Sequence, residues 1–184
     1  ISTSNLAATT AASVDRADDD VLDEAVEFVL SAQRVLFYVG QGAADVAGDL
    51  ARAISALGAV VASSPSGRGI VAEYDDRVLP LDATGDLAAF NAIAAECDAV
   101  VVLGAAMAEN GSIGFGIDFP ANRLVRVDIS GAVLAAPPAA RFSVRASSEE
   151  FLAALLGAVA RSGRPSASRG FDTSAARALR PRLQ

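Results

Sequence analysis

The chain has 184 residues, of which 52% are hydrophobic, and a formal net charge of -7. This length and composition are typical of one α/β domain with a full buried core and argue against a disordered chain. The acidic balance argues against a nucleic-acid partner, because phosphate binding requires a basic surface. No apolar run approaches the ~20 residues needed to cross a bilayer, so we expect no membrane partner.

The sequence contains no histidine and no lysine, so all 15 basic residues are arginine. Without histidine there is no Ser-His-Asp triad and no zinc-binding imidazole, and without lysine there is no Schiff base or P-loop lysine. The single cysteine, Cys97, is expected to be a buried structural thiol. The absence of histidine and lysine favours a binding or structural domain over a self-sufficient catalyst, although carboxylate pairs can perform acid/base chemistry alone.

Both ends of the chain are typical of linkers around one ordered domain. Residues 1–17 are rich in Ser, Thr and Ala without periodicity, and residues 162–184 mix Ser, Gly, Pro and Arg. We therefore expect one domain over residues 18–161, with a linker or the end of a preceding domain before it and a linker towards a following domain after it. The start of the chain lacks the basic region of a signal peptide, which favours a cytoplasmic location.

The first elements predicted are a helix, a strand and a second helix. Three aspartates starting at Asp18 precede apolar residues at helical spacing, and acids stabilise a helix N-terminus. The apolar run Val35–Val39 predicts a buried strand, and Gly40–Gly42 predicts a tight turn. A helix is expected next, over residues 43–57, and Gly58 would end it.

The remaining elements continue the alternation of strands and helices. Ser147 or Ser148, together with Glu150, resembles a helix cap. Such alternation predicts an α/β fold, a Rossmann-like doubly wound parallel sheet of about six strands with helices on both faces. In chain order we expect a strand at 59–62, a turn-rich segment at 63–69, a weaker strand at 78–81, a helix at 87–96, strands at 99–103, 124–127 and 142–144, and a helix at 148–159.

Three features could carry chemistry, each with a simpler structural alternative. The Gly40–Gly42 turn opens a helix, so it is either a phosphate cradle or a tight structural turn. Asp128 follows a strand, where a carboxylate can accept from a ribose hydroxyl or cap the next turn. The glycine-containing loop at 104–116 is either functional or a surface excursion. Glu149 and Glu150 are most simply partners of a helix dipole, and no carboxylate pair stands out as catalytic.

Four segments together resemble landmarks of one enzyme family: Arg34–Ala43, Gly67–Gly69, Cys97–Ala105 and Leu124–Ile129. In order and spacing they match glycine-turn, glycine-basic-glycine, aspartate-to-leucine-glycine and valine-aspartate-isoleucine landmarks. The stretch from about residue 21 to residue 159 thus resembles the central domain of the thiamine-diphosphate enzymes, the group of acetolactate synthase, benzoylformate decarboxylase and oxalyl-CoA decarboxylase.

This resemblance implies that the catalytic machinery lies outside the chain. In such enzymes one flanking domain supplies a glutamate that activates the thiamine ring, and the other a Gly-Asp-Gly motif for magnesium and diphosphate. Here Gly85–Asp86 is followed by Leu87, so this pair is not that motif. The resemblance therefore implies no catalytic residue and no metal ligand in this chain. It implies as partners the flanking domains of the same polypeptide, in a homo-oligomer (dimer or tetramer).

Some family members hold FAD or an ADP-like nucleotide in this domain, and the resemblance carries that site over. The chain departs from the flavin-binding pattern at Gly104–Met107, which lacks an arginine, at Asp82–Gly85, which keeps one glycine of two, and at Arg145–Ala146, where a Gly-Asp pair is usual. The corresponding positions are Gly40, Gln41, Gly42, Ser64, Pro65, Gly104, Ala105, Asp128 and Ile129.

For the intact protein, the resemblance implies carboligation or decarboxylation of a 2-oxo acid or a related substrate, with this chain as the non-catalytic central domain. Two alternatives come from other classes. One is a free-standing module that binds a nucleotide such as FAD or ADP. The other is a purely structural or oligomerisation module without catalysis. Binding of a nucleotide would discriminate between these two.

Overall fold

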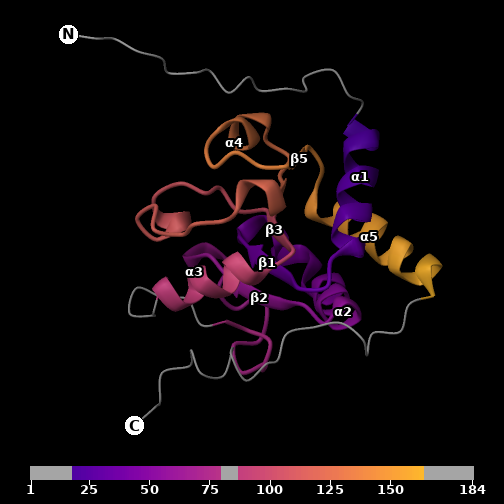
Figure 1. The fold of residues 1–184 in the computed structure, drawn as a ribbon, viewed down its shortest axis with the longest axis horizontal. Helices are drawn as coiled ribbons and strands as arrows, with labels where there is room; N and C mark the ends of the chain where they lie inside the picture. Colours follow the sequence, from indigo (N-terminus) through magenta and orange to yellow (C-terminus); the bar gives the residue numbers. More distant parts are fainter. Residues whose placement is uncertain (1–17, 80–86, 164–184) are drawn as a thin grey trace.

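The computed structural model describes residues 18–79 and 87–163 (Figure 1). The predicted linkers, apart from Ser162 and Gly163, and the turn at 82–85 therefore lie outside the described residues. Five strands form one all-parallel sheet in the order β2-β1-β3-β4-β5. The predicted α/β fold with a parallel sheet is confirmed.

Strands β1 and β3 coincide with strongly apolar runs of the sequence, VLFYV and AVVVL. Every residue of the two central strands β1 and β3 is buried, as expected for parallel strands covered on both faces. Their register pairs Val35 with Ala99 and Val39 with Leu103. The five strands are β1 (Val35–Val39), β2 (Val60–Ser63), β3 (Ala99–Leu103), β4 (Leu124–Val127) and β5 (Phe142–Val144).

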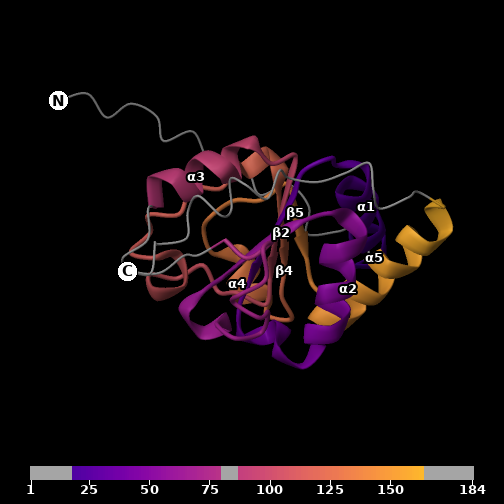
Figure 2. The same ribbon diagram turned by 90° about the horizontal axis from the view of Figure 1, so that it is seen from below.

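Helices cover both faces of the sheet, as predicted. Figure 2 shows α1 (Asp18–Ser31), α2 (Ala47–Leu57) and α5 (Ser148–Ser162) on one side and α3 (Leu87–Glu96) on the other. Strand alternation therefore divides the core into two layers. From β1, for example, Phe37 belongs to one cluster and its neighbours Leu36 and Tyr38 belong to the other.

The predicted sixth strand, at 78–81, is reduced to an isolated bridge in which Val78 pairs with Val61. The Leu79 N–H donates to the Val61 carbonyl at 2.7 Å, and the Val61 N–H donates to the Arg77 carbonyl at 2.9 Å. Before the bridge, Asp75 holds a turn by accepting from the Arg77 N–H, and residues 80 and 81 of the predicted strand lie outside the described residues. The described sheet therefore has five strands instead of about six.

Two helical segments differ from the prediction. The helix expected at 43–57 is split into a 3-10 helix, η1 (Gln41–Val46), followed by α2, which ends at Gly58 with φ 61°. A short helix, α4 (Gly131–Ala135), was not predicted. Its five residues are too few to show helical periodicity, and the Ser130 side chain caps it by accepting from the Val133 N–H.

The last helix confirms its predicted start and runs longer than expected. Ser147 is the N-cap and forms a reciprocal capping box with Glu150, which resolves the choice between Ser147 and Ser148. The helix ends at Ser162 instead of 159. The Ser148 hydroxyl donates to the Gly42 carbonyl at 2.8 Å, so the start of α5 is tied to the turn after β1.

Candidate functional site at the carboxyl ends of the strands

All nine positions of the candidate site follow directly from the carboxyl ends of four strands. Because the sheet is parallel, these ends lie at the same edge, which we call the carboxyl edge, where doubly wound sheets bind ligands. By strand, the nine positions are Gly40, Gln41 and Gly42 after β1, Ser64 and Pro65 after β2, Gly104 and Ala105 after β3, and Asp128 and Ile129 after β4.

Glycines bring the loops after β1, β2 and β3 into backbone contact. A Cβ on Gly40 would lie 2.3 Å from the Gly104 carbonyl oxygen, and one on Gly67 would lie 2.4 Å from the Val39 carbonyl oxygen. Gly104 itself has φ +58°, and its Cβ would lie 2.6 Å from the Gly42 Cα. Strand order reverses between β1 and β3, and at this switch point the glycines pack the two loops directly together.

Three N–H groups at the glycine turn are hydrogen-bonded to backbone carbonyls of the chain. The Gly40 N–H donates to Leu103, the Gly42 N–H to Gly104 and the Ala43 N–H to Gly40, each to a carbonyl at 3.0 Å. These bonds are those of a structural turn that joins the loops after β1 and β3. A phosphate at this edge would therefore need charge partners other than these three groups.

The β2 end of the site is formed by Ser64 and Pro65. The Ser64 N–H donates to the Val39 carbonyl at 2.9 Å, and its hydroxyl lies 3.1 Å from that of Ser66. Ser64 is 1% exposed, whereas Pro65 is exposed. Only part of this segment is therefore accessible to a ligand.

Asp128 and Ile129 form the β4 end of the site. One Asp128 carboxylate oxygen, Oδ1, accepts from the Ser130 N–H at 2.8 Å, which is the turn-capping role that the sequence left open. Among the described residues, its second oxygen accepts no hydrogen bond from the protein. Ile129 is 72% exposed. This end of the site thus combines an available carboxylate oxygen with an exposed apolar side chain.

Sequence reasoning missed Arg126, which lies in β4 and is 2% exposed. Its guanidinium donates to the carbonyls of Val133 at 2.7 Å and Pro138 at 2.9 Å, and also to that of Ala136. Burial lowers the pKa of Arg126, and the nearby Asp128 carboxylate opposes that shift. Arg126 thus fastens the segment after Asp128 to the sheet. The signal in the sequence was a single charge inside an apolar strand.

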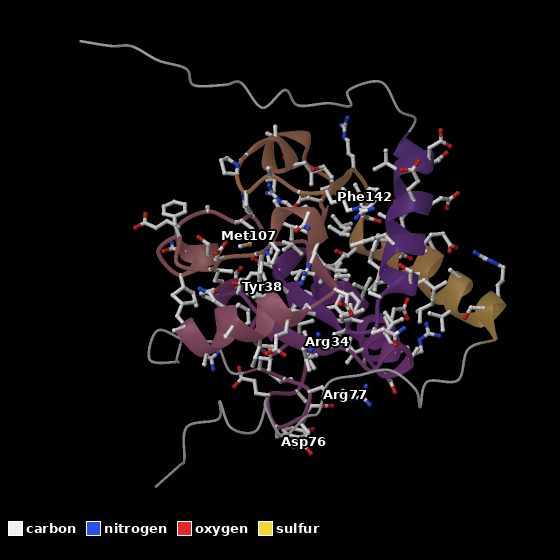
Figure 3. The ribbon with its side chains drawn as sticks, in the orientation of Figure 1. Arg34, Tyr38, Asp76, Arg77, Met107 and Phe142 are labelled. Carbon is white, nitrogen blue, oxygen red and sulfur yellow. The ribbon has the colours of Figure 1, made fainter. Side chains whose placement is uncertain are left out.

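Two further titratable groups are buried, and neither is suited to act as a nucleophile. Burial raises the pKa of the Cys97 thiol to about 12, and its buried structural role was expected. Burial also raises the pKa of Tyr38, whose hydroxyl donates to the Gly111 carbonyl at 2.6 Å. Tyr38 and Met107 belong to the same buried cluster under the loop after β3 (Figure 3). Tyr38 and Cys97 therefore serve the packing of this buried cluster.

The loop after β3 contains a strained turn. Ile113 and Phe115 have φ of 52° and 60°, a backbone region that β-branched and bulky residues rarely adopt. Hydrogen bonds hold this turn, including those from the Asn91 side chain to Gly116 and from the Gly114 N–H to the Glu109 carbonyl. The predicted surface excursion is thus an ordered loop packed on the α3 face of the sheet.

Among residues 18–79 and 87–163, no three His, Cys, Asp or Glu side chains lie together where they could hold a metal ion. Within the same ranges, no helix has the length and apolarity to cross a membrane. The candidate site is therefore described by its backbone turns, the Asp128 carboxylate and exposed side chains.

Comparison with known protein families matches residues 22–155, most of the chain, to the family described as thiamine pyrophosphate enzyme, central domain. No curated protein matches the chain. The matched range contains every described strand and all nine positions of the candidate site. It covers α1 and α5 in part and the other described helices completely. The chain therefore belongs to the central-domain family of the thiamine pyrophosphate enzymes.

Proposed function

We propose that this chain is the non-catalytic central domain of an enzyme that uses thiamine diphosphate to make or break the carbon–carbon bond next to a carbonyl of a 2-oxo acid or a related substrate. The reaction would be a carboligation or decarboxylation of the acetolactate synthase type. The observation that carries this proposal is the family match over residues 22–155. The buried Tyr38 and Cys97, with their raised pKa values, support a structural role for this domain.

Thiamine diphosphate and magnesium do not fit the residues described here. Magnesium takes oxygen ligands at near-octahedral geometry, and no three candidate side chains converge within the described ranges. The glycine turn after β1 spends three of its N–H groups on backbone carbonyls. We therefore place the thiamine diphosphate and Mg²⁺ of the proposed enzyme in flanking domains of the same polypeptide.

The test is an assay of the intact gene product that contains this chain. We expect it to consume a 2-oxo acid such as pyruvate only when thiamine diphosphate and Mg²⁺ are both present. The 184-residue chain alone should be inactive under the same conditions. Turnover by the 184-residue chain, or turnover by the intact product without thiamine diphosphate, would contradict the proposal.

A second candidate function is binding of an FAD or ADP-like nucleotide at the carboxyl edge. The observation that favours it is the free carboxylate oxygen of Asp128 beside the exposed Ile129, at the edge where doubly wound sheets receive ligands. A thermal shift with ADP, FAD, NAD and coenzyme A tests it. A ligand at a hundredfold excess over its Kd stabilises the folded state by about 2.7 kcal/mol, and no shift with any of the four would contradict nucleotide binding.

We also propose that the domain contributes to a homo-oligomer, a dimer or a tetramer, together with the flanking domains. The support is the family match and the exposure of the large apolar side chains Phe115 and Ile129. Light scattering on the intact gene product checks this, and a monomeric mass would contradict it.

A further inference from the structure

Helices α1 and α5 contact each other on the same face of the sheet and leave a groove between them, which we call the α1–α5 groove (Figure 2). Its volume is about 460 Å³, within the range of pockets that bind small molecules, so side chains of a docked segment can enter it. The groove combines charged side chains with small and apolar ones. The lining residues are Asp23, Val26 and Glu27 of α1 and Ala153, Ala154, Gly157 and Arg161 of α5.

The charged side chains of the α1–α5 groove have no partners among the described residues. Asp23, Glu27 and Arg161 are exposed, and their side chains form no ion pair or hydrogen bond there. Arg161 reaches back over Gly157, where an added Cβ would lie 3.2 Å from its Nη1. The groove thus presents two carboxylates and one guanidinium that can pair with charges from elsewhere.

One wall of the groove is strongly acidic, and the chain contains a basic segment next to it. The 14 residues of α1 include six acids, at positions 18, 19, 20, 23, 24 and 27, and no base. Residues 164–184 carry five arginines, at positions 164, 169, 177, 180 and 182, against one acid, Asp172. This segment directly follows Gly163, the residue that caps α5. Opposite charges on neighbouring parts of a chain attract each other.

We propose that the arginine-rich segment 164–184 docks in the α1–α5 groove, with its arginines against Asp23 and Glu27. The segment has 21 residues and spans up to about 70 Å when extended, whereas the 15-residue helix α5 is about 22 Å long, so it can fold back along the groove. It also supplies one carboxylate, Asp172, for Arg161, and an apolar side chain, Phe171, for the uncharged part of the groove.

Docking would fix the path of the chain as it leaves the domain. In the proposed enzyme a flanking domain follows this segment, and docking would hold its starting point at the α1–α5 face of the sheet. The inference does not depend on that function, because it concerns contacts within the 184-residue chain.

Limited digestion of the 184-residue chain with trypsin tests the docking. Trypsin cleaves after arginine, so mass spectrometry can follow cleavage after Arg169 and Arg177. We expect both sites to be cut about 3-fold to 10-fold faster in Asp23→Asn/Glu27→Gln, because two ion pairs are lost and cleavage follows the fraction of undocked segment. Salt at about 1 M should remove most of this difference by screening the ion pairs. Circular dichroism checks that the variant stays folded.

The matched control is Asp45→Asn/Glu109→Gln, which removes two exposed carboxylates outside the groove. This variant should be cut at the wild-type rate. Equal rates in the wild type and the groove variant would overturn the docking. Equal acceleration in both double variants would show a general effect of charge and would overturn it as well.

A dilution series distinguishes docking within one chain from coverage of the groove by a second copy. At a fixed trypsin concentration, we expect the difference between the wild type and the groove variant to be the same at every protein concentration. A difference that disappears on dilution would assign the groove to a second copy and overturn docking within one chain. A difference found in the intact gene product but absent from the 184-residue chain would assign the groove to a flanking domain, which also overturns the proposal.

Discussion

The two edges of the sheet are held by different kinds of contact. At the amino edge, side chains bind backbone: the Asp98 carboxylate accepts from the N–H groups of Gln33 at 3.1 Å and Arg34 at 2.9 Å. Arg123 donates to the Ala95 and Cys97 carbonyls, both at 2.9 Å. At the carboxyl edge, the loops after β1, β2 and β3 meet through glycine backbone.

The difference shows which edge is available for function. At the amino edge, charged side chains are used to close the ends of helices and strands; Arg77, for example, donates to the Ile54 carbonyl at the end of α2 (Figure 3). At the carboxyl edge, glycine backbone joins the loops after β1, β2 and β3, Asp128 and Ser148 add side-chain hydrogen bonds to backbone, and side chains such as Ile129 and Arg145 are exposed. The fold thus frees the edge where parallel sheets bind ligands.

The largest expected effect is at the glycine contact. Gly40→Ala places a Cβ 2.3 Å from a backbone oxygen of Gly104, which cannot move without shifting β3, so we expect a loss of about 4 kcal/mol in the free energy of unfolding. Urea unfolding followed by circular dichroism measures it. The control is Gly48→Ala in α2, where nothing lies within 4 Å of the added Cβ and stability should be unchanged or rise by up to about 1 kcal/mol. Equal stability of the two variants would contradict the claim that close glycine backbone contacts hold the carboxyl edge together.

Next in size is the arginine that fastens the segment after β4. Arg126→Met keeps most of the buried volume but leaves the carbonyls of Val133, Ala136 and Pro138 without their donor, at an expected cost of about 3 kcal/mol. Hydrogen exchange should show lost protection in α4 before any loss in β1. A uniform loss of protection across the sheet would instead mean that Arg126 serves the whole core.

Substitution at the amino edge should lower the free energy of unfolding by less than the two changes above. Asp98→Ala removes the acceptor of two backbone N–H groups at a half-buried position, and we expect the free energy of unfolding to fall by about 2 kcal/mol in chemical denaturation. Asp98→Asn is the matched variant, because both N–H groups donate to one carboxylate oxygen, Oδ2, and the neutral amide oxygen can take its place. It should recover part of that loss, and identical stability of the two variants would argue that the hydrogen bonds contribute little.

The smallest effect is expected from Glu150. Its carboxylate accepts a hydrogen bond from the Ser147 N–H, which lowers the pKa of Glu150. A carboxylate with a lowered pKa in the folded state stabilises the fold above its unfolded pKa, and this contribution is lost as the pH falls through the folded value. Stability measured below the ordinary value of 4.5 should therefore decline less steeply with falling pH in Glu150→Gln than in the wild type. Parallel pH profiles would show that the capping box has no titrating partner.

Sequence reasoning worked best where burial alone decides structure. The bounds of β1, β3 and α3 were predicted as they are found, because an apolar run on a two-sided parallel sheet leaves few alternatives. Of the strand predicted at 78–81, the described residues show only an isolated bridge between Val78 and Val61, and α4, which is too short for periodicity, was missed.

The candidate site was predicted less completely than the fold. Its nine positions came from the family resemblance, and the structure places them after the carboxyl ends of four strands, along one edge, while their role in binding stays a prediction. Long-range backbone contacts, such as that of Gly40 with Gly104, leave no local signal in the sequence beyond the glycines themselves. The hydrogen bonds of Arg126 span up to 12 residues, so they can be identified only from the three-dimensional arrangement.

The most direct test of the central claim is a calorimetric titration of thiamine diphosphate with Mg²⁺ into two samples, the intact gene product and the 184-residue chain. As a non-catalytic central domain, the chain should show no binding, whereas the intact product should bind the cofactor. Binding by the 184-residue chain alone would contradict the assignment of the cofactor to flanking domains. Absence of binding by the intact product would contradict its assignment as a thiamine diphosphate enzyme.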